Sequence, residues 1–163
     1  MLVRRRPILG TAGDISVAEC HLAWHRVLAG YAQLEALMHE AVYVRLFSDD
    51  HGESHFEEVE VALQPVDFAP PAPPLHVAEL FPTLHCSFVS GPPDWGGHVP
   101  HPSPRRQLLC NLRGEYDVTA SDDTVRRFSP GSVLLLEDTT GKGHTTRIVS
   151  DDDMLLVAVA LAG

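Results

Sequence analysis

The chain has 163 residues, of which 44% are hydrophobic, and its 22 acidic and 12 basic residues give a formal net charge of -10. This length predicts one domain whose core needs no disulfide bonds. The acidic balance argues against a nucleic-acid partner, which requires clustered Lys and Arg. No apolar run approaches the roughly 18 residues of a membrane-spanning helix. Composition therefore favours a small-molecule or protein partner.

The cysteines indicate the compartment. Cys20, Cys86 and Cys110 are odd in number and widely spaced, and no CxxC pair is present. A disulfide framework or a structural zinc site is therefore not expected. The sequence predicts a protein of the reducing cytoplasm.

Residues 1–40 are predicted to form an N-terminal extension. From Val17 to Met38, apolar residues recur every three to four positions, which is typical of an amphipathic helix. Two interpretations stay open. The helix packs on the rest of the protein or on a second subunit, or else Met38 is the true start and residues 1–37 are an upstream extension or a linker.

Residues 41–83 are predicted to hold N-terminal strands and a proline-rich arm. Residues 41–47 alternate between apolar and polar, as a strand does, and residues 55–63 form an acidic, edge-like strand. Eleven of the 13 prolines lie between residues 65 and 104. Proline cannot donate a ladder hydrogen bond, so an extended arm is expected here. Buried apolar side chains should pin this arm down: Phe68, Leu75 and Phe81.

Residues 84–163 are predicted to form the core of an all-β fold. Short strands with turn signals every 8 to 12 residues or so are typical of a sandwich or barrel. The expected strands read LHCSFVS, RQLLCNLRG, EYDVTAS, TVRRF, SVLLLE, HTTRIVS and DMLLVAVAL. Gly114 is expected to join RQLLCNLRG to EYDVTAS as strand partners. The apolar run in SVLLLE indicates burial on both faces, or one packed face and one that lines a pocket.

Two motifs in this region resemble those of the cupin superfamily. Gly114 matches the terminal glycine of the first motif, and counting back places Gln107 at the position of the metal-binding Glu. His101 then matches the first His of that motif, and Ser103 stands where the second His would be. The second motif opens at Pro130-Gly131, and its histidine is best matched by His144. The strings PRRQ and SPGSVLLLEDTTGKGHTT are similar to those of a subgroup of small, functionally undefined bacterial cupins.

The resemblance implies a double-stranded β-helix, or jelly-roll barrel. The helical N-terminal extension expected from periodicity precedes it in the chain. The resemblance also implies a site for one divalent metal, Fe, Mn, Ni or Zn, because imidazole and carboxylate suit these ions. Here the expected ligands are His101, Gln107 and His144, and additional ligands could come from His98 and Glu137. Replacing the family's Glu by Gln107 removes a negative charge, so weaker affinity is expected. A pocket without metal is the open alternative.

Two further residues are candidates for substrate binding. Period-two alternation places Arg105 on the same face as Gln107, where its guanidinium could pair with a carboxylate. Asp138 or Glu137 could act as a general base; alternatively, Asp138 forms a turn and Glu137 pairs with an arginine. The chain is therefore interpreted as a small-molecule-binding cupin. The alternatives are a metal-dependent enzyme of the dioxygenase or isomerase type and a non-catalytic structural homodimer.

Overall fold

A computed structural model describes residues 39–162. By its internal contacts the chain divides into Met1–His39 and Glu40–Gly163, and the helix expected in the N-terminal extension lies outside the described residues. The described part is all-β, as predicted, and none of its residues forms a helix that could span a bilayer. Its strands are β1 (Glu40–Ser48), β2 (Ser54–Ala62), β3 (Gln64–Val66), β4 (Leu75–Val77), β5 (Thr83–Gly91), β6 (Gln107–Arg113), β7 (Tyr116–Ala120), β8 (Val125–Phe128), β9 (Val133–Leu136), β10 (His144–Ile148) and β11 (Met154–Leu161).

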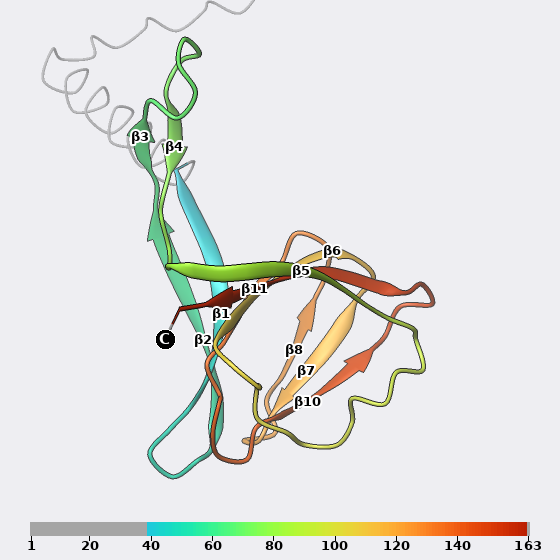
Figure 1. Ribbon diagram of the computed structural model, residues 1–163. Coiled ribbons are helices and arrows are strands. Elements are labelled where there is room, and N and C mark those ends of the chain that lie inside the picture. The colour runs from blue at the N-terminus through green and yellow to red at the C-terminus, as the bar shows by residue number, and fades with distance from the viewer. Residues whose placement is uncertain (1–38, 163) are drawn as a thin grey trace, which may run out of the picture. The chain divides into compact units, whose positions relative to one another are not determined.

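Two sheets form the body of this unit, and Figure 1 shows the smaller sheet facing the larger one. The larger sheet has six strands in the order β2-β1-β9-β6-β11-β5, and the smaller has three in the order β10-β7-β8. Neighbours are antiparallel, except that β1 runs parallel to β9. Strands distant in sequence therefore lie side by side, as the jelly-roll expectation requires.

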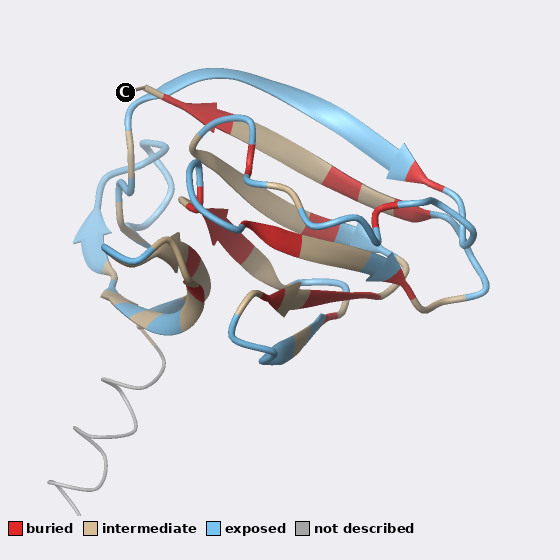
Figure 2. Ribbon diagram, turned by 90° about the horizontal axis from the view of Figure 1, so that it is seen from below, coloured by how far each residue is buried: buried red, intermediate tan, exposed pale blue. Residues whose placement is uncertain are grey.

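The core lies between the two sheets. Tyr116, Val118 and Phe128 of the smaller sheet and Leu46 and Leu134 of the larger one are at most 2% exposed. Figure 2 shows buried residues on the inner strands of both sheets and an exposed β5 along nearly its whole length. Alternate residues of each strand face inward, since successive side chains point to opposite faces. This alternation determines which residues can line a cavity between the sheets.

Two expected strand arrangements are corrected by the structure. RQLLCNLRG and EYDVTAS, expected to be partners, lie in different sheets: β6 pairs with β9 and β11, and β7 pairs with β8 and β10. Gly114, with a φ of 74°, turns the chain from one sheet into the other. The core is also not confined to residues 84–163, because β1 lies next to β9 and its Leu46 is fully buried.

The proline-rich segment folds back on itself instead of forming one extended arm, because β3 and β4 pair as an antiparallel two-stranded ladder. The prediction that buried apolar side chains pin it down is wrong at two of three positions. Phe68 is 65% exposed and Leu75 is 53% exposed. Only Phe81 is held, since its ring lies 6.3 Å from that of Tyr43 and under the guanidinium of Arg106.

Candidate functional site

A cavity of about 230 Å³ opens between the two sheets. Both sheets contribute to its walls, and the lining is mostly apolar. Its lining residues are Val89, Ser90, Gly91, Trp95, His101, Ser103, Pro104, Gln107, Leu109, Tyr116, Val118, Leu134, Leu136, His144, Thr146, Met154, Leu156 and Ala158. A mostly apolar concave site with a few polar groups is the usual form of a small-molecule pocket.

His101 and His144 lie together in this cavity, as the two motifs predicted. Their backbones form an isolated antiparallel bridge, with N–H to O distances of 3.0 Å in both directions. The two ring centroids are 5.0 Å apart, and the ring planes are tilted by 47°. This bridge holds His144, the first residue of β10, against His101 in the segment that precedes β6.

Hydrogen bonds to oxygen orient both imidazoles. His101 Nδ1 lies 2.8 Å from the carbonyl oxygen of Val99, and His144 Nδ1 lies 2.6 Å from Asp138 Oδ2. Asp138 is fully buried, and its other carboxylate oxygen has no hydrogen-bond partner in the described part of the chain. Asp138, a candidate for substrate binding, therefore contacts His144 and does not line the cavity.

Gln107 also lines the cavity, and its side-chain amide lies 3.4 Å from Ser103 Oγ. Three other candidates lie outside the lining: His98 and Arg105 are exposed, and Glu137 is partly buried elsewhere. Period-two alternation failed to place Arg105 because it precedes β6, where the strand geometry does not yet apply. The structure thus brings together His101, Gln107 and His144 in one cavity.

Glu137 pairs with two arginines and does not line the cavity. Pairing with an arginine was one of the two interpretations of Glu137 from the sequence. Its carboxylate accepts hydrogen bonds from Arg45 Nε at 2.5 Å and from Arg106 Nε at 2.8 Å. Burial alone would raise the pKa of Glu137, but Arg45 and then Arg106 outweigh this effect and lower it. Both carboxylate oxygens of Glu137 are thus used. Glu137 directly follows β9, and it binds Arg45 of β1 and Arg106, which directly precedes β6.

Several cavity residues were not identified from sequence. Tyr116 and Val118 line it from β7, and Trp95 lies in the loop between β5 and β6. Burial raises the pKa of Tyr116, so its hydroxyl stays protonated. Alternation in EYDVTAS places Tyr116 and Val118 on one face, which was the available signal. Trp95 had no such signal, because a loop has no periodicity.

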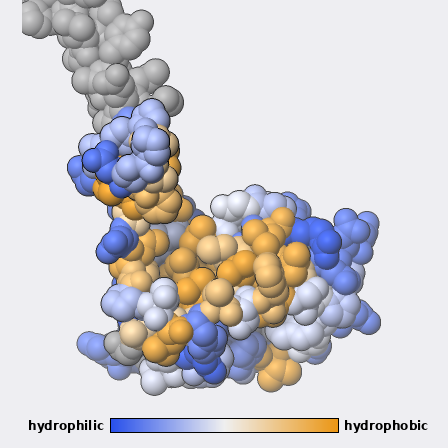
Figure 3. Space-filling model, turned by 45° about the horizontal axis from the view of Figure 1, so that its top comes forward, coloured by the Kyte–Doolittle hydropathy of each residue, from blue (hydrophilic) through white to orange (hydrophobic). Residues whose placement is uncertain are grey.

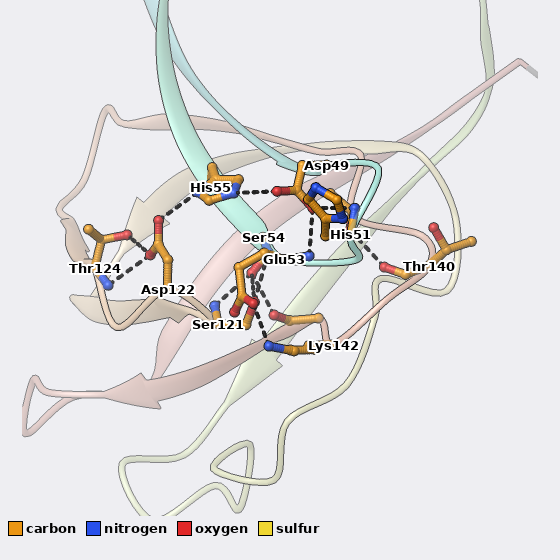
Figure 4. Close-up of polar contacts among 12 residues, drawn as sticks. Asp49, His51, Glu53, Ser54, His55, Ser121, Asp122, Thr124, Thr140 and Lys142 are labelled. Atoms are coloured by element: carbon orange, nitrogen blue, oxygen red, sulfur yellow. Dashed lines mark hydrogen bonds and ion pairs between the residues drawn. The ribbon is translucent and has the colours of Figure 1, made fainter.

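The loop that carries His144 is tied to two turns (Figure 4). Ser54 Oγ donates to the carbonyl of Gly143 at 2.7 Å, and Ser54 N donates to Ser121 Oγ at 2.7 Å. Lys142 pairs with Glu53. These contacts connect the β1–β2 turn, the β7–β8 turn and the segment just before β10, so they help to fix the position of His144.

His55 bridges two carboxylates in the same cluster. Its Nδ1 lies 2.7 Å from Asp122 Oδ2, and its Nε2 lies 3.2 Å from Asp49 Oδ2. Both ring nitrogens can donate only in the charged imidazolium. The hydrogen bonds to Asp122 and then Asp49 raise the pKa of His55 above its ordinary value of 6.5.

Replacing His55 by glutamine is expected to destabilise the protein more at mildly acidic pH than at alkaline pH. Because the folded-state pKa is raised, the stabilisation is fully present below the ordinary value of 6.5 and is lost as pH rises through the raised pKa. Urea unfolding of both proteins at about pH 5.5 and about pH 9 measures this. A destabilisation that does not change with pH would show that the charge of His55 is not involved.

The donor set meets only part of the requirement for a metal. Within residues 39–162, no group of three or more His, Cys, Asp or Glu side chains is placed to hold one ion. The cavity offers two imidazoles and the neutral amide of Gln107. Catalytic zinc sites also use three protein ligands, but these are His, Cys or carboxylate side chains. Because the set lacks an anionic ligand, it fits a weakly held metal and not a tightly held one.

Comparisons with known proteins do not establish a family for this chain. No protein-family model and no curated protein matches the sequence. Among solved structures, the chain is similar to the cupin domain of Cnp3 from Schizosaccharomyces pombe, at 20% identity, with 76% of this chain and 85% of that chain covered and a TM-score of 0.37. The description of this fold rests on its own strand pairing.

Proposed function

We propose that this protein is a cupin-type protein that binds a small, largely apolar molecule between its two sheets. The observation that carries the proposal is the cavity of about 230 Å³, with His101, Gln107 and His144 as polar groups among apolar walls. Buried apolar cavities of about 150 Å³ are known to accept benzene. A compound of about one ring therefore fits by size, and its apolar surface gains about 25 cal/mol for each Å² removed from water.

Filling the cavity from β11 is expected to abolish binding. Ala158 lines the cavity, so Ala158→Phe occupies its space, whereas Val157→Phe on the opposite face of the same strand is the matched control. Calorimetric titration of the full chain with toluene and 4-methylphenol should show at least about tenfold weaker binding for Ala158→Phe only. Equal binding by the two variants would contradict the location of the site.

A divalent metal on His101, Gln107 and His144 is the second candidate, and it would support the enzymatic alternative of a dioxygenase or isomerase type. The observation that favours it is that both imidazoles are oriented through Nδ1, which leaves Nε2 free, as in many metal-bound histidines. Zinc titration of the purified chain tests it. Binding that survives His101→Ala with His144→Ala would exclude this site.

A structural homodimer is the third candidate, favoured by the outer face of the larger sheet. On β5, Leu84 is 66% exposed and Phe88 is 76% exposed, and on β6 Leu112 is 49% exposed. Val157 of β11 lies opposite Phe88 in the ladder and continues this apolar face. Figure 3 shows hydrophobic side chains gathered over a broad area on the side where β5 and β11 lie. Contiguous exposed apolar surface of this kind marks an interaction site.

A second copy of the chain is the occupant that the charge favours. Thr83–Gly91 contains no Asp, Glu, Lys or Arg, although the chain carries a net charge of -10, so two copies can approach here without facing acidic groups. The strands β5, β11, β6 and β9 have 9, 8, 7 and 4 residues. At about 3.3 Å per residue and about 4.8 Å between strands, they give a face of roughly 440 Å² before side-chain relief. A stable interface needs about 800 Å² for each partner.

Phe88→Glu is expected to dissociate this dimer. A charge placed at the centre of an apolar contact is left without a partner, so the dissociation constant should rise by about 30-fold or more. Sedimentation at micromolar concentrations measures it. Val125→Glu is the control, because Val125 is 58% exposed on β8 of the other sheet. A monomeric wild-type chain at these concentrations would overturn the homodimer proposal.

A further inference from the structure

The hydrogen bonds of the two cavity histidines determine which ring nitrogen carries a proton. A backbone carbonyl oxygen can only accept, so the contact with Val99 requires a hydrogen on His101 Nδ1. The Asp138 carboxylate likewise accepts from His144 Nδ1. In the neutral form of each imidazole, the hydrogen is therefore on Nδ1, and Nε2 offers a lone pair.

The serine hydroxyls in the lining are also used as donors within the protein. Ser90 Oγ donates to the carbonyl of Met154 at 2.9 Å, and Ser103 Oγ donates to the carbonyl of Arg105 at 2.9 Å. Each hydroxyl group then offers only its oxygen lone pairs to a ligand. Donors also line the cavity, on Gln107, Thr146, Tyr116 and Trp95. One amide hydrogen of Gln107 is directed to Ser103, and the buried Tyr116 hydroxyl has no hydrogen-bond partner in the described part of the chain.

We infer that the ligand bound in this cavity carries a hydroxyl group on a compact apolar body, as in a phenol or a small alcohol, and that its O–H donates to Nε2 of His101 or His144. The inference rests on the proposed small-molecule site and names the class of its ligand. The lone pairs on the two histidines match the O–H of such a ligand, and the ligand oxygen can accept in turn from a lining donor such as the Tyr116 hydroxyl. A carboxylate would present only further acceptors to the histidines.

The buried carboxylate of Asp138 strengthens this selectivity. It is fully buried next to His144, with one oxygen unpartnered in the described part of the chain. A second negative charge at the histidines would be repelled at close range in a site of low dielectric constant. A carboxylate analogue of the same size should therefore bind more weakly than either the phenol or the plain hydrocarbon.

Three probes of matched shape test the inference on the full chain: 4-methylphenol, toluene and 4-methylbenzoate. Calorimetric titration at neutral pH is expected to give about five- to tenfold tighter binding of 4-methylphenol than of toluene, which is the effect of one hydrogen bond. 4-Methylbenzoate should bind most weakly. Equal affinity for 4-methylphenol and toluene, or tightest binding of 4-methylbenzoate, overturns the inference and leaves the cavity proposal standing. Failure of all three to bind overturns both.

Variants of the two histidines locate the acceptor. The double variant His101→Leu with His144→Leu should lose the preference for 4-methylphenol while still binding toluene. His101→Leu alone keeps the test decisive if the double variant does not fold, because His101 is partly exposed whereas His144 is buried beside Asp138. It should reduce the preference by about twofold or more. An unchanged preference in every folded variant would overturn the assignment of the acceptors.

Discussion

Gly143→Ala is expected to destabilise the protein by about 3–5 kcal/mol, combining a left-handed backbone cost with steric overlap. Gly143 has a φ of 71°, and a Cβ built there would lie 2.1 Å from the carbonyl carbon and 2.2 Å from the carbonyl oxygen of His101. These are backbone atoms, so no side-chain rotation can relieve the overlap. The bridge between His101 and His144 would have to open, and ligand binding should weaken with stability.

Gly131→Ala is the matched control. Gly131 also has a positive φ, of 91°, but nothing lies within 4 Å of an added Cβ. Only the backbone cost of about 1–2 kcal/mol is then expected. Urea unfolding of both variants separates the two effects. Similar losses would show that crowding against His101 does not constrain the loop before β10.

Leu46→Ala is expected to cost about 2–5 kcal/mol, the range for a fully buried leucine. Leu46 is 0% exposed, and its backbone lies in the parallel pair between β1 and β9. A melting temperature lower by about 5–15 °C should follow for a protein of this size. The variant tests whether the N-terminal strands are an integral part of the core.

Val42→Ala on the same strand is the control. Val42 is 56% exposed, so a change within about 0.5 kcal/mol is expected. If Leu46→Ala were as mild as Val42→Ala, residues 84–163 would hold the core largely without β1. Thermal unfolding of the two variants under the same conditions decides between these cases.

The site was predictable where a motif fixed a residue's place in the fold. His101, Gln107 and His144 lie in one cavity, although up to 43 residues of sequence separate them. Which arginines pair with Glu137, and where Arg105 lies, could not be predicted in this way. Glu137 is used by Arg45, which is 92 residues away in the sequence. Such a pairing depends on the parallel contact between β1 and β9, which no local pattern specifies.

The sequence by itself determined an all-β chain and the approximate extent of most strands, because alternation and turn residues act over a few positions. The expectation that His101 and His144 share a site came from the resemblance of two motifs to those of cupins, not from alternation. Only the tertiary structure decided which strands share a sheet. It places β7 in the sheet opposite β6 instead of beside it, and it shows that Tyr116 lines the cavity. The reason is physical. Inward-facing positions are set by local alternation, but the partner across a sheet or a core is set by long-range packing.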